Sequence, residues 1–409
     1  MSEAPVTTAP TTDPSTVPTI DDDPYGEHGS TDPTAFQVAV RETADVVRLD
    51  RLGCWATGRH EHVVPVLRNW QDYGSAAGVG LSNFATGRAW RQTSILLEAD
   101  PPHHDAPHRV LAEILSPRTQ RTLRESWFAE AERLVDALLD RRTTFDALTD
   151  LAMAYPLQAF PDAVGIAQGD RHRLMAFSDF LFNAFGPRNA LVRDAGADAR
   201  SHSEWVDRSC RREALTPGGL GARIWAAADR GEITAEQAPD VVRSLFAAGV
   251  NTTVHALGSL LHALATHPAQ WALVREDAGV RRRALDEALR WSTPVQTFFR
   301  TTTREVELAG VPLGRHEKVM VLLGAANRDP RRWTDPDAFD VTRDPAGHVG
   351  FGTGLHACLG QSFARLEAEA LLTALARRVA TIEPAGPAVP RANNTLRAWS
   401  SIPVRVTRA

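Results

Sequence analysis

The sequence predicts a single large domain that is mainly α-helical and carries small β-sheets. Apolar residues return every three or four positions over most of the stretch from about 107 to 265, which is the periodicity of amphipathic helices. Two-residue alternation is confined to short segments near the C-terminal side, VELAGVPL, KVMVLL and IPVRV, which predict short strands. No internal repeat and no Pro/Gly-rich linker follows residue 35, so one domain is expected over 34–409.

Composition is that of an ordinary globular protein. Of the 409 residues, 43% are hydrophobic and 23% are charged, which allows a sizeable core. The net charge of −5 gives no reason to expect a nucleic-acid partner. No apolar run approaches the ~20 residues that span a bilayer, and the start lacks the basic-then-apolar order of a secretory signal. Three cysteines far apart in sequence predict reduced thiols, so a cytoplasmic protein without a membrane partner is expected.

The N-terminal end is expected to differ from the rest. Residues 1–33 are rich in Thr, Pro, Asp and Ser and have almost no large apolar side chains, which predicts a disordered tail. A helix from about 35 to 44 should follow. Residues 46–49 and 54–57 then predict a short strand pair around the turn DRLG.

The strongest local signal is a glycine-rich loop around a cysteine, FGTGLHACLGQSFA, at residues 351–364. Its glycines let the backbone turn and approach a flat cofactor without Cβ clashes. The amphipathic segment that follows predicts a helix, which places Cys358 at a helix N-terminus, where free N–H groups and the helix dipole favour a thiolate. The alternative interpretation is a buried structural cysteine beside a glycine turn.

The spacing of Phe351, Gly354, Cys358, Gly360 and Ala364 resembles the haem-binding signature of the cytochrome P-450 superfamily of haem-thiolate monooxygenases. The resemblance implies the cytochrome P-450 fold and haem b as cofactor, with Cys358 as the axial iron ligand and Phe351 beside the haem. A thiolate ligand pushes electron density onto iron and favours cleavage of the O–O bond. The resemblance therefore implies an oxidoreductase that uses O2.

Two charged residues upstream resemble the family's Glu-x-x-Arg pair, Glu287 and Arg290. Residues three apart share a helix face and can pair, so alone this pattern usually marks a solvated surface pair. The resemblance implies instead that the pair and Arg343 form a trio that locks the scaffold behind the haem.

The segment DPPHH, residues 100–104, resembles the family's lead-in to the helix that covers one haem edge. Haem propionates need cationic or donor groups, and the resemblance assigns that role to His104, His108, Arg300 and His356. His108 stands where the family usually has Arg, which predicts a weaker or pH-sensitive contact. The alternative for such a histidine is a packed or surface residue.

The segment FAAGVNTT, residues 246–253, is predicted to lie in the middle of a helix. A glycine there costs about 1 kcal/mol relative to alanine, and threonine can hydrogen-bond a carbonyl of its own helix. The segment resembles the family's oxygen-binding kink, which places Gly249 at the haem and gives Thr252 and Asn251 a part in proton delivery. The family usually has an acid where Asn251 stands, and an amide cannot take up and release a proton as a carboxylate does.

The resemblance extends to the bacterial para-alkoxybenzoate (4-methoxybenzoate) O-demethylases and covers roughly residues 35–407. It is carried by the segments FGPRN (185–189), VQTFFR (295–300), ANRDPRRW (326–333) and NNTLR (393–397). In that group, Arg and Ser side chains hold a carboxylate at the far end of the pocket. The matching residues are Arg91, Ser94, Arg243 and Ser244.

The spacing of these positions suits a para-substituted aromatic acid. Ser244 and Thr252 are eight residues apart on one predicted helix, which gives an axial offset of ~12 Å, about the length of such a ring with a polar group at each end. Flat apolar walls are expected from Phe182, Phe185, Phe298, Ala247 and Ala248. Arg243 has the alternative of a surface arginine, and each Phe has the alternative of ordinary core.

The leading hypothesis is a monooxygenase that O-demethylates para-substituted benzoic acids with O2. The chain has no flavin or iron–sulfur motif, so electrons should come from a ferredoxin and its NADH-dependent reductase. A basic docking face for an acidic ferredoxin is expected from Arg118, Arg121, Arg124, Arg281, Arg282, Arg283 and Arg365. The alternatives are a hydrogen peroxide-driven peroxygenase of the same fold, for which Asn251 is the only hint, and a non-catalytic haem-binding or ligand-binding protein.

Overall fold

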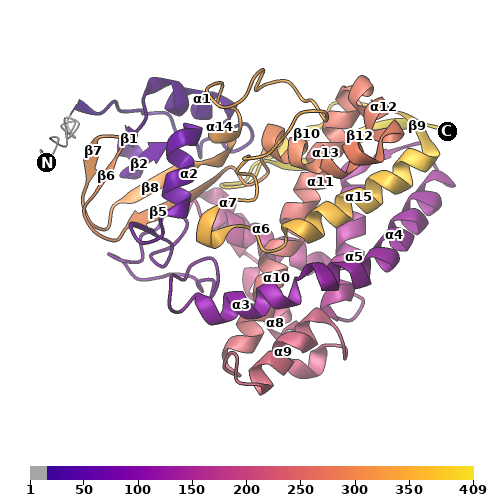
Figure 1. Ribbon diagram of the computed structural model, residues 1–409, viewed down its shortest axis with the longest axis horizontal. Helices are drawn as coiled ribbons and strands as arrows, with labels where there is room; N and C mark the ends of the chain where they lie inside the picture. The colour runs from indigo at the N-terminus through magenta and orange to yellow at the C-terminus, as the bar shows by residue number, and fades with distance from the viewer. Residues whose placement is uncertain (1–15) are drawn as a thin grey trace, which may run out of the picture.

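Helices make up most of the computed structural model, which describes residues 16–409 (Figure 1). The α-helices are α1 (Thr34–Thr43), α2 (His60–Arg68), α3 (Asp105–Ile114), α4 (Pro117–Leu139), α5 (Ala154–Val164), α6 (His172–Asn183), α7 (Ala190–Gly196), α8 (Ala199–Ser209), α9 (Leu220–Asp229), α10 (Gln237–Gly249), α11 (Asn251–Thr266), α12 (Pro268–Glu276), α13 (Ala278–Ser292), α14 (Leu323–Asn327) and α15 (Gln361–Arg378). Short helical turns are η2 (Asp50–Leu52), η3 (Leu148–Met153), η4 (Arg212–Ala214) and η5 (Gly354–His356). The predicted class, mainly α with small sheets, is confirmed.

The strands form small sheets. They are β1 (Val47–Leu49), β2 (Cys54–Thr57), β3 (Tyr73–Gly74), β4 (Thr144–Asp146), β5 (Thr297–Thr302), β6 (Val306–Leu308), β7 (Val311–Leu313), β8 (Lys318–Leu322), β9 (Val379–Pro384), β10 (Val389–Arg391), β11 (Ala398–Ser401) and β12 (Pro403–Arg408). The largest sheet has the order β1-β2-β8-β5-β3, and β4-β12-β9, β10-β11 and β6-β7 form the others. Within the largest sheet only β2 and β8 are parallel.

Both faces of the five-stranded sheet are covered, because its strands bury side chains on each side. On one face, α1 packs Phe36 and Val40 against Met320 of β8. On the other face, α2 packs Val63 and Val66 against the alternate residues of the same strand. The expected helix at about 35–44 and the expected strand pair are thus confirmed as α1, β1 and β2.

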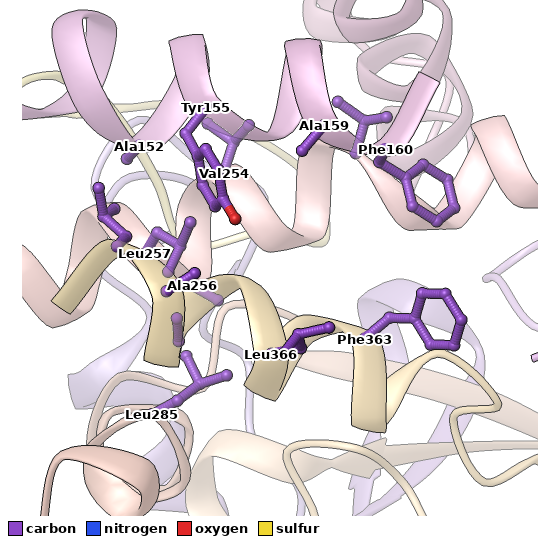
Figure 2. Close-up of a cluster of buried hydrophobic side chains, with 14 of the residues drawn as sticks. Ala152, Tyr155, Ala159, Phe160, Val254, Ala256, Leu257, Leu285, Phe363 and Leu366 are labelled. Carbon is purple, nitrogen blue, oxygen red and sulfur yellow. The ribbon is translucent and has the colours of Figure 1, made fainter. Parts of the chain in front are cut away.

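The main hydrophobic core lies among the long helices. Figure 2 shows Tyr155, Ala159 and Phe160 of α5 projecting toward Phe363 and Leu366 of α15. Val254, Ala256 and Leu257 of α11 and Leu285 of α13 belong to the same cluster. This packing fixes α11 and α15 relative to each other. Among the described residues, no helix is both long enough and apolar enough to cross a membrane.

The N-terminal segment departs from the expected disordered tail. Residues 1–15 lie outside the described residues, but Val17 and Tyr25 are buried. The backbone also pairs with β1, since Arg48 N donates to Pro18 O at 2.9 Å and Ile20 N donates to Arg48 O at 2.9 Å. Few apolar side chains are enough to order this segment, because its backbone hydrogen-bonds to the free edge of β1.

The expected trio of charges is present and buried. Arg290 and Glu287 are 0% and 1% exposed, and two of their N···O distances are 2.7 and 2.8 Å. Arg290 also donates to the carbonyls of Asn327, Pro336 and Ala338. Arg343 Nε lies 3.4 Å from the same Glu287 carboxylate. The trio therefore ties α13 to the segment that leads into the cysteine loop.

Candidate active site

A cavity of about 320 Å³ lies between α3, α6, the α10–α11 pair, β5 and the cysteine loop. All but one of the predicted site residues line it. They are Arg91, Ser94, His104, His108, Phe182, Phe185, Arg243, Ser244, Ala247, Ala248, Gly249, Thr252, Phe298, Arg300, Phe351, His356 and Cys358. Segments more than 250 residues apart in sequence therefore meet around a single space.

The cysteine loop is held open by its glycines. Gly352 and Gly354 have φ of 66° and 76°, in the left-handed region that favours glycine. A Cβ on Gly354 would also lie 2.7 Å from Arg68 Cα on α2, so the loop must pass this helix closely. Cys358 N donates to Phe351 O at 2.8 Å, which closes the loop and points the thiol into the cavity.

Two effects oppose each other at the Cys358 thiol. Burial raises its pKa, whereas the backbone N–H groups of Gly360 and Gln361 and the charge of Arg365 act to lower it. Helix α15 starts at Gln361, as the amphipathic pattern predicted. Arg365 is held by Asp286 at 2.8 Å and lies 4.8 Å over the ring of Phe351. These donors favour a thiolate once a cation is close to the sulfur.

A cluster of imidazoles and one arginine lines the cavity near the loop. The rings of His104 and His108 are 4.6 Å apart, and those of His104 and His356 are 5.0 Å apart. Burial lowers the pKa of His104 to about 4 and also lowers the pKa values of His108 and His356. Burial lowers the pKa of Arg300 to about 10, so this guanidinium stays charged at neutral pH.

Several donors in this cluster have no hydrogen-bond partner within residues 16–409. They include His104 Nδ1 and His356 Nε2, although these atoms lie 3.7 Å from the Asp105 carboxylate and 3.5 Å from the Asp100 carboxylate, respectively. Arg300 donates only to its neighbour's carbonyl, Phe299 O, and has no ion pair among the described residues. Buried donors without acceptors are costly, so their arrangement fits an anionic group in the cavity.

The predicted helix kink is present between α10 and α11. The helical pattern is interrupted at Val250. Three successive carbonyls before this break accept side-chain hydroxyl groups: Ala247 O from Ser178 at 2.8 Å, Ala248 O from Thr252 at 2.6 Å, and Gly249 O from Thr253 at 3.0 Å. These hydroxyls replace backbone donors that the break removes, which stabilises the kink.

Asn251 lies on the other side of this kink. It is 0% exposed and does not line the cavity. Neither its amide oxygen nor its amide nitrogen has a hydrogen-bond partner in the described part of the chain. Thr252 faces the cavity and Asn251 faces the interior, because neighbouring helix residues point about 100° apart. Of the two residues predicted to take part in proton delivery, only Thr252 therefore lines the cavity.

The predicted aromatic walls come together. The ring centroids of Phe182 and Phe185 are 5.7 Å apart, and those of Phe185 and Phe298 are 6.1 Å apart, both in edge-to-face geometry. Val79 packs in the same cluster. Ala247 and Ala248 supply small side chains on the opposite helix, which leaves a flat space for an aromatic ring.

The four residues predicted to bind the substrate carboxylate, which we call the polar end, also line the cavity: Arg91, Ser94, Arg243 and Ser244. Both arginines already lie next to a carboxylate of the protein. Arg91 makes two short contacts, of 2.6 and 2.7 Å, to Glu98. Arg243 Nε lies 3.1 Å from Asp207. Ser244 Oγ donates to Asp240 O at 2.9 Å, whereas Ser94 Oγ accepts from Leu97 N at 3.0 Å and keeps its proton for a ligand. Partners from other segments cannot be read from local sequence spacing.

Three acids that sequence reasoning missed also line the cavity: Glu98, Asp240 and Glu367. Glu367 is 1% exposed, and burial raises its pKa well above the ordinary value, which favours the neutral form. It falls on the apolar face of α15 with Phe363 and Leu371, which was a readable signal. Glu98 follows two leucines in the segment ILLEAD, and a charge in such a run marks a buried acid.

Comparison with known proteins identifies the family. A family model described as "Cytochrome P450" matches residues 220–395. A relative from Rhodopseudomonas palustris, "Cytochrome p450 CYP199A2", is 48% identical over 408 residues, which cover 100% of this chain and 99% of that protein. The chain belongs to the cytochrome P450 family.

Another relative and a solved structure are also similar to this chain. The 6-deoxyerythronolide B hydroxylase of Saccharopolyspora erythraea is 31% identical over 314 residues, which are 75% of this chain and 77% of the hydroxylase. The solved structure of cytochrome P450 CYP109Q5 from Chondromyces apiculatus has 29% identity and a TM-score of 0.78, covering 96% of this chain and 99% of that one. The chain is thus a cytochrome P450 monooxygenase whose cofactor is haem b, as predicted, and a non-catalytic binding protein is not supported.

The cavity fits haem b. The Cys358 thiol opens into it near backbone donors, and His104, His356 and Arg300 line the same cavity, where two propionates need donors. Phe351 and Gly249 line the space between these groups and the kink. The expected cofactor residues are therefore gathered around one site.

Proposed function

We propose that this P450 O-demethylates para-alkoxybenzoic acids, such as 4-methoxybenzoate, with O2 as the oxidant. One observation carries the proposal: the Cys358 thiol and Thr252 line the same cavity as the four predicted carboxylate-binding residues, Arg91, Ser94, Arg243 and Ser244. Aromatic rings line the space between. The 48% identity to CYP199A2 over the whole chain supports the close resemblance on which the substrate class rests.

In this proposal Cys358 ligates the haem iron, and His104, His108, Arg300 and His356 hold the propionates. When bound, the haem supplies the activation of O2. The polar end orients the substrate by charge-assisted hydrogen bonds, and the rings of Phe182, Phe185 and Phe298 exclude water around it.

The overall reaction balances as an insertion of one oxygen atom. O2, two electrons and two protons convert the methoxy carbon to a hydroxymethoxy group and release one water. The resulting hemiacetal breaks its carbon–oxygen bond to give the 4-hydroxybenzoate product and formaldehyde. Thr252 is proposed to take part in proton delivery, since it lines the cavity and its hydroxyl is held there by the bond that it donates to Ala248 O at 2.6 Å.

The carboxylate is the recognition group of the substrate. Replacing it with an amide, as in 4-methoxybenzamide, should leave cationic and hydroxyl donors of the polar end unsatisfied, at roughly 1–3 kcal/mol for each group. Spectral titration of both compounds checks this. Equal affinity for 4-methoxybenzamide and 4-methoxybenzoate would contradict the pocket assignment.

Asn251 is expected to slow proton delivery. Because its side chain does not line the cavity, an acid at this position would have to act through Thr252, the next residue of the helix, which does line it. Asn251→Asp should recover part of the roughly 10²–10⁴-fold that a positioned acid–base group contributes to rate. The measurement is NADH-driven turnover at saturating ferredoxin, with the solvent isotope effect expected to be smaller in Asn251→Asp. Asn251→Leu is the control, since it also lacks a titratable group and should show no gain. Unchanged turnover in Asn251→Asp would assign proton delivery to other groups.

The electron donor is proposed to be a ferredoxin served by an NADH-dependent reductase. Arg118, Arg121 and Arg124 lie exposed on α4, and Gln120 of this helix donates to Ser362 O beside the cysteine loop at 2.8 Å. Arg281, Arg282 and Arg283 start α13, which also packs on α15. An acidic partner on this surface would be close to Cys358.

The three free cysteines support a reducing, cytoplasmic location.

A further inference from the structure

The polar end of the cavity contains a buried ion pair, Arg91 and Glu98. Their side chains are 6% and 0% exposed. Both Arg91 terminal nitrogens contact Glu98, at 2.6 and 2.7 Å, and the carboxylate also accepts from Ser94 N at 3.0 Å and Val79 N at 3.2 Å. Glu98 is therefore a fully satisfied carboxylate, and its charge is held against the guanidinium that faces the ligand space.

The pair is fixed to the aromatic wall. The Arg91 guanidinium lies 4.9 Å over the ring of Phe185 and 5.4 Å over that of Phe84. Its Nε atom is buried and has no hydrogen-bond partner within residues 16–409. Three of the five Arg91 N–H groups are used, two by Glu98 and one by Gln92 O, so two donors remain although the charge is already compensated.

Within the described residues 16–409, no second cation forms an ion pair with Glu98. Lys318 donates to Ala77 O and Gly78 O, next to the Val79 N–H that Glu98 binds. Burial lowers the pKa of Lys318 to about 7, so it carries only part of a charge at neutral pH. The remaining cation of the polar end, Arg243, has its own carboxylate at Asp207.

We propose that Glu98 is a specificity-determining residue, which neutralises Arg91 and so sets how strongly the cavity prefers an acid over its neutral analogue. In this arrangement Arg91 acts as a hydrogen-bond donor and an aromatic wall, and not as a free positive charge. The affinity of the cavity for carboxylates is therefore lower than an unpaired arginine would give. Neutral para-alkoxy aromatics can still bind, because they do not have to compensate a free positive charge. This inference rests on the proposed function.

Three variants test the balance of charge: Glu98→Gln, Arg91→Gln and the double variant. Spectral dissociation constants are measured for 4-methoxybenzoate, 4-methoxybenzamide and the cation 4-methoxybenzylamine. Glu98→Gln should raise the affinity for the acid by about tenfold and leave that for the amide unchanged, because a buried positive charge is released. Arg91→Gln should weaken acid binding by about tenfold or more and improve binding of the amine, since Glu98 then faces the ligand alone.

The double variant shows whether acid binding depends on the combined charge of Arg91 and Glu98 or on Arg91 alone. If the pair acts as a unit, adding Glu98→Gln to Arg91→Gln restores most of the lost acid affinity. If Arg91 alone holds the acid, Glu98→Gln adds nothing in that background, and the inference is wrong. Should Glu98→Gln not fold, a gain in amine binding by Arg91→Gln still supports the inference, and no gain overturns it.

Asp162→Asn is the matched control, because it removes the partner of the largely buried Arg171 at 2.6 Å, away from the cavity. It should leave all three dissociation constants unchanged. Failure of the inference and failure of the proposed function are distinguishable. An unmodified protein that binds acid and amide equally overturns both, whereas a clear acid preference that Glu98→Gln does not change overturns only the role of Glu98.

Discussion

Cys358→His should abolish the thiolate signature in the absorption spectrum of the reduced, carbon monoxide-bound protein and eliminate O2-driven O-demethylation. Imidazole is a neutral ligand and cannot push electron density onto iron as a thiolate does. The effect is expected to be complete for the spectral signature, since among residues 16–409 no other cysteine lines the cavity.

Cys54→Ala and Cys210→Ala are the matched controls. Both thiols are buried in apolar clusters, and burial raises their pKa values, so neither forms a thiolate readily. Each variant should keep the thiolate spectrum and turnover. Survival of that spectrum in Cys358→His would refute the ligand assignment, whatever happens to turnover.

Sequence reasoning was most successful where chemistry depends on local spacing. The cysteine loop and the helix after it follow from glycine and apolar positions within one segment, whereas the kink at Val250 was implied by the family resemblance of the segment FAAGVNTT. Amphipathic periodicity likewise predicted the main helices, and two-residue alternation predicted β6, β7, β8 and β12. Such patterns are determined by neighbours in the chain, so they can be read without the fold.

Properties that depend on distant partners could not be predicted. Arg243 and Asp207 come from different helices, and no local pattern indicated that they pair. Asn251 was placed beside Thr252 by sequence adjacency, but rotation along the helix turns it into the interior. The N-terminal segment was judged on its composition, although the edge of β1 supplies the hydrogen bonds that it lacks by itself.

The buried Glu287–Arg290 ion pair should contribute much more to stability than an exposed Glu–Arg pair with the same i,i+3 spacing, Glu130–Arg133. Glu287→Gln should destabilise the protein by about 3–5 kcal/mol, because it leaves the Arg290 charge uncompensated in the interior. The loop that carries Cys358 should then be less well held, so haem retention should fall as well. The midpoint of urea unfolding and the haem content of the purified variant measure the two effects.

Glu130→Gln is the control, since Glu130 and Arg133 have the same i,i+3 spacing on α4, and the Arg133 side chain is 65% exposed. An exposed pair contributes about 0–1 kcal/mol, because water solvates both charges when the pair is broken. The expected order is therefore a large loss for Glu287→Gln and almost none for Glu130→Gln. Equal losses would mean that burial does not set the strength of the pair. An unchanged haem content in a destabilised Glu287→Gln would separate the trio from the cysteine loop.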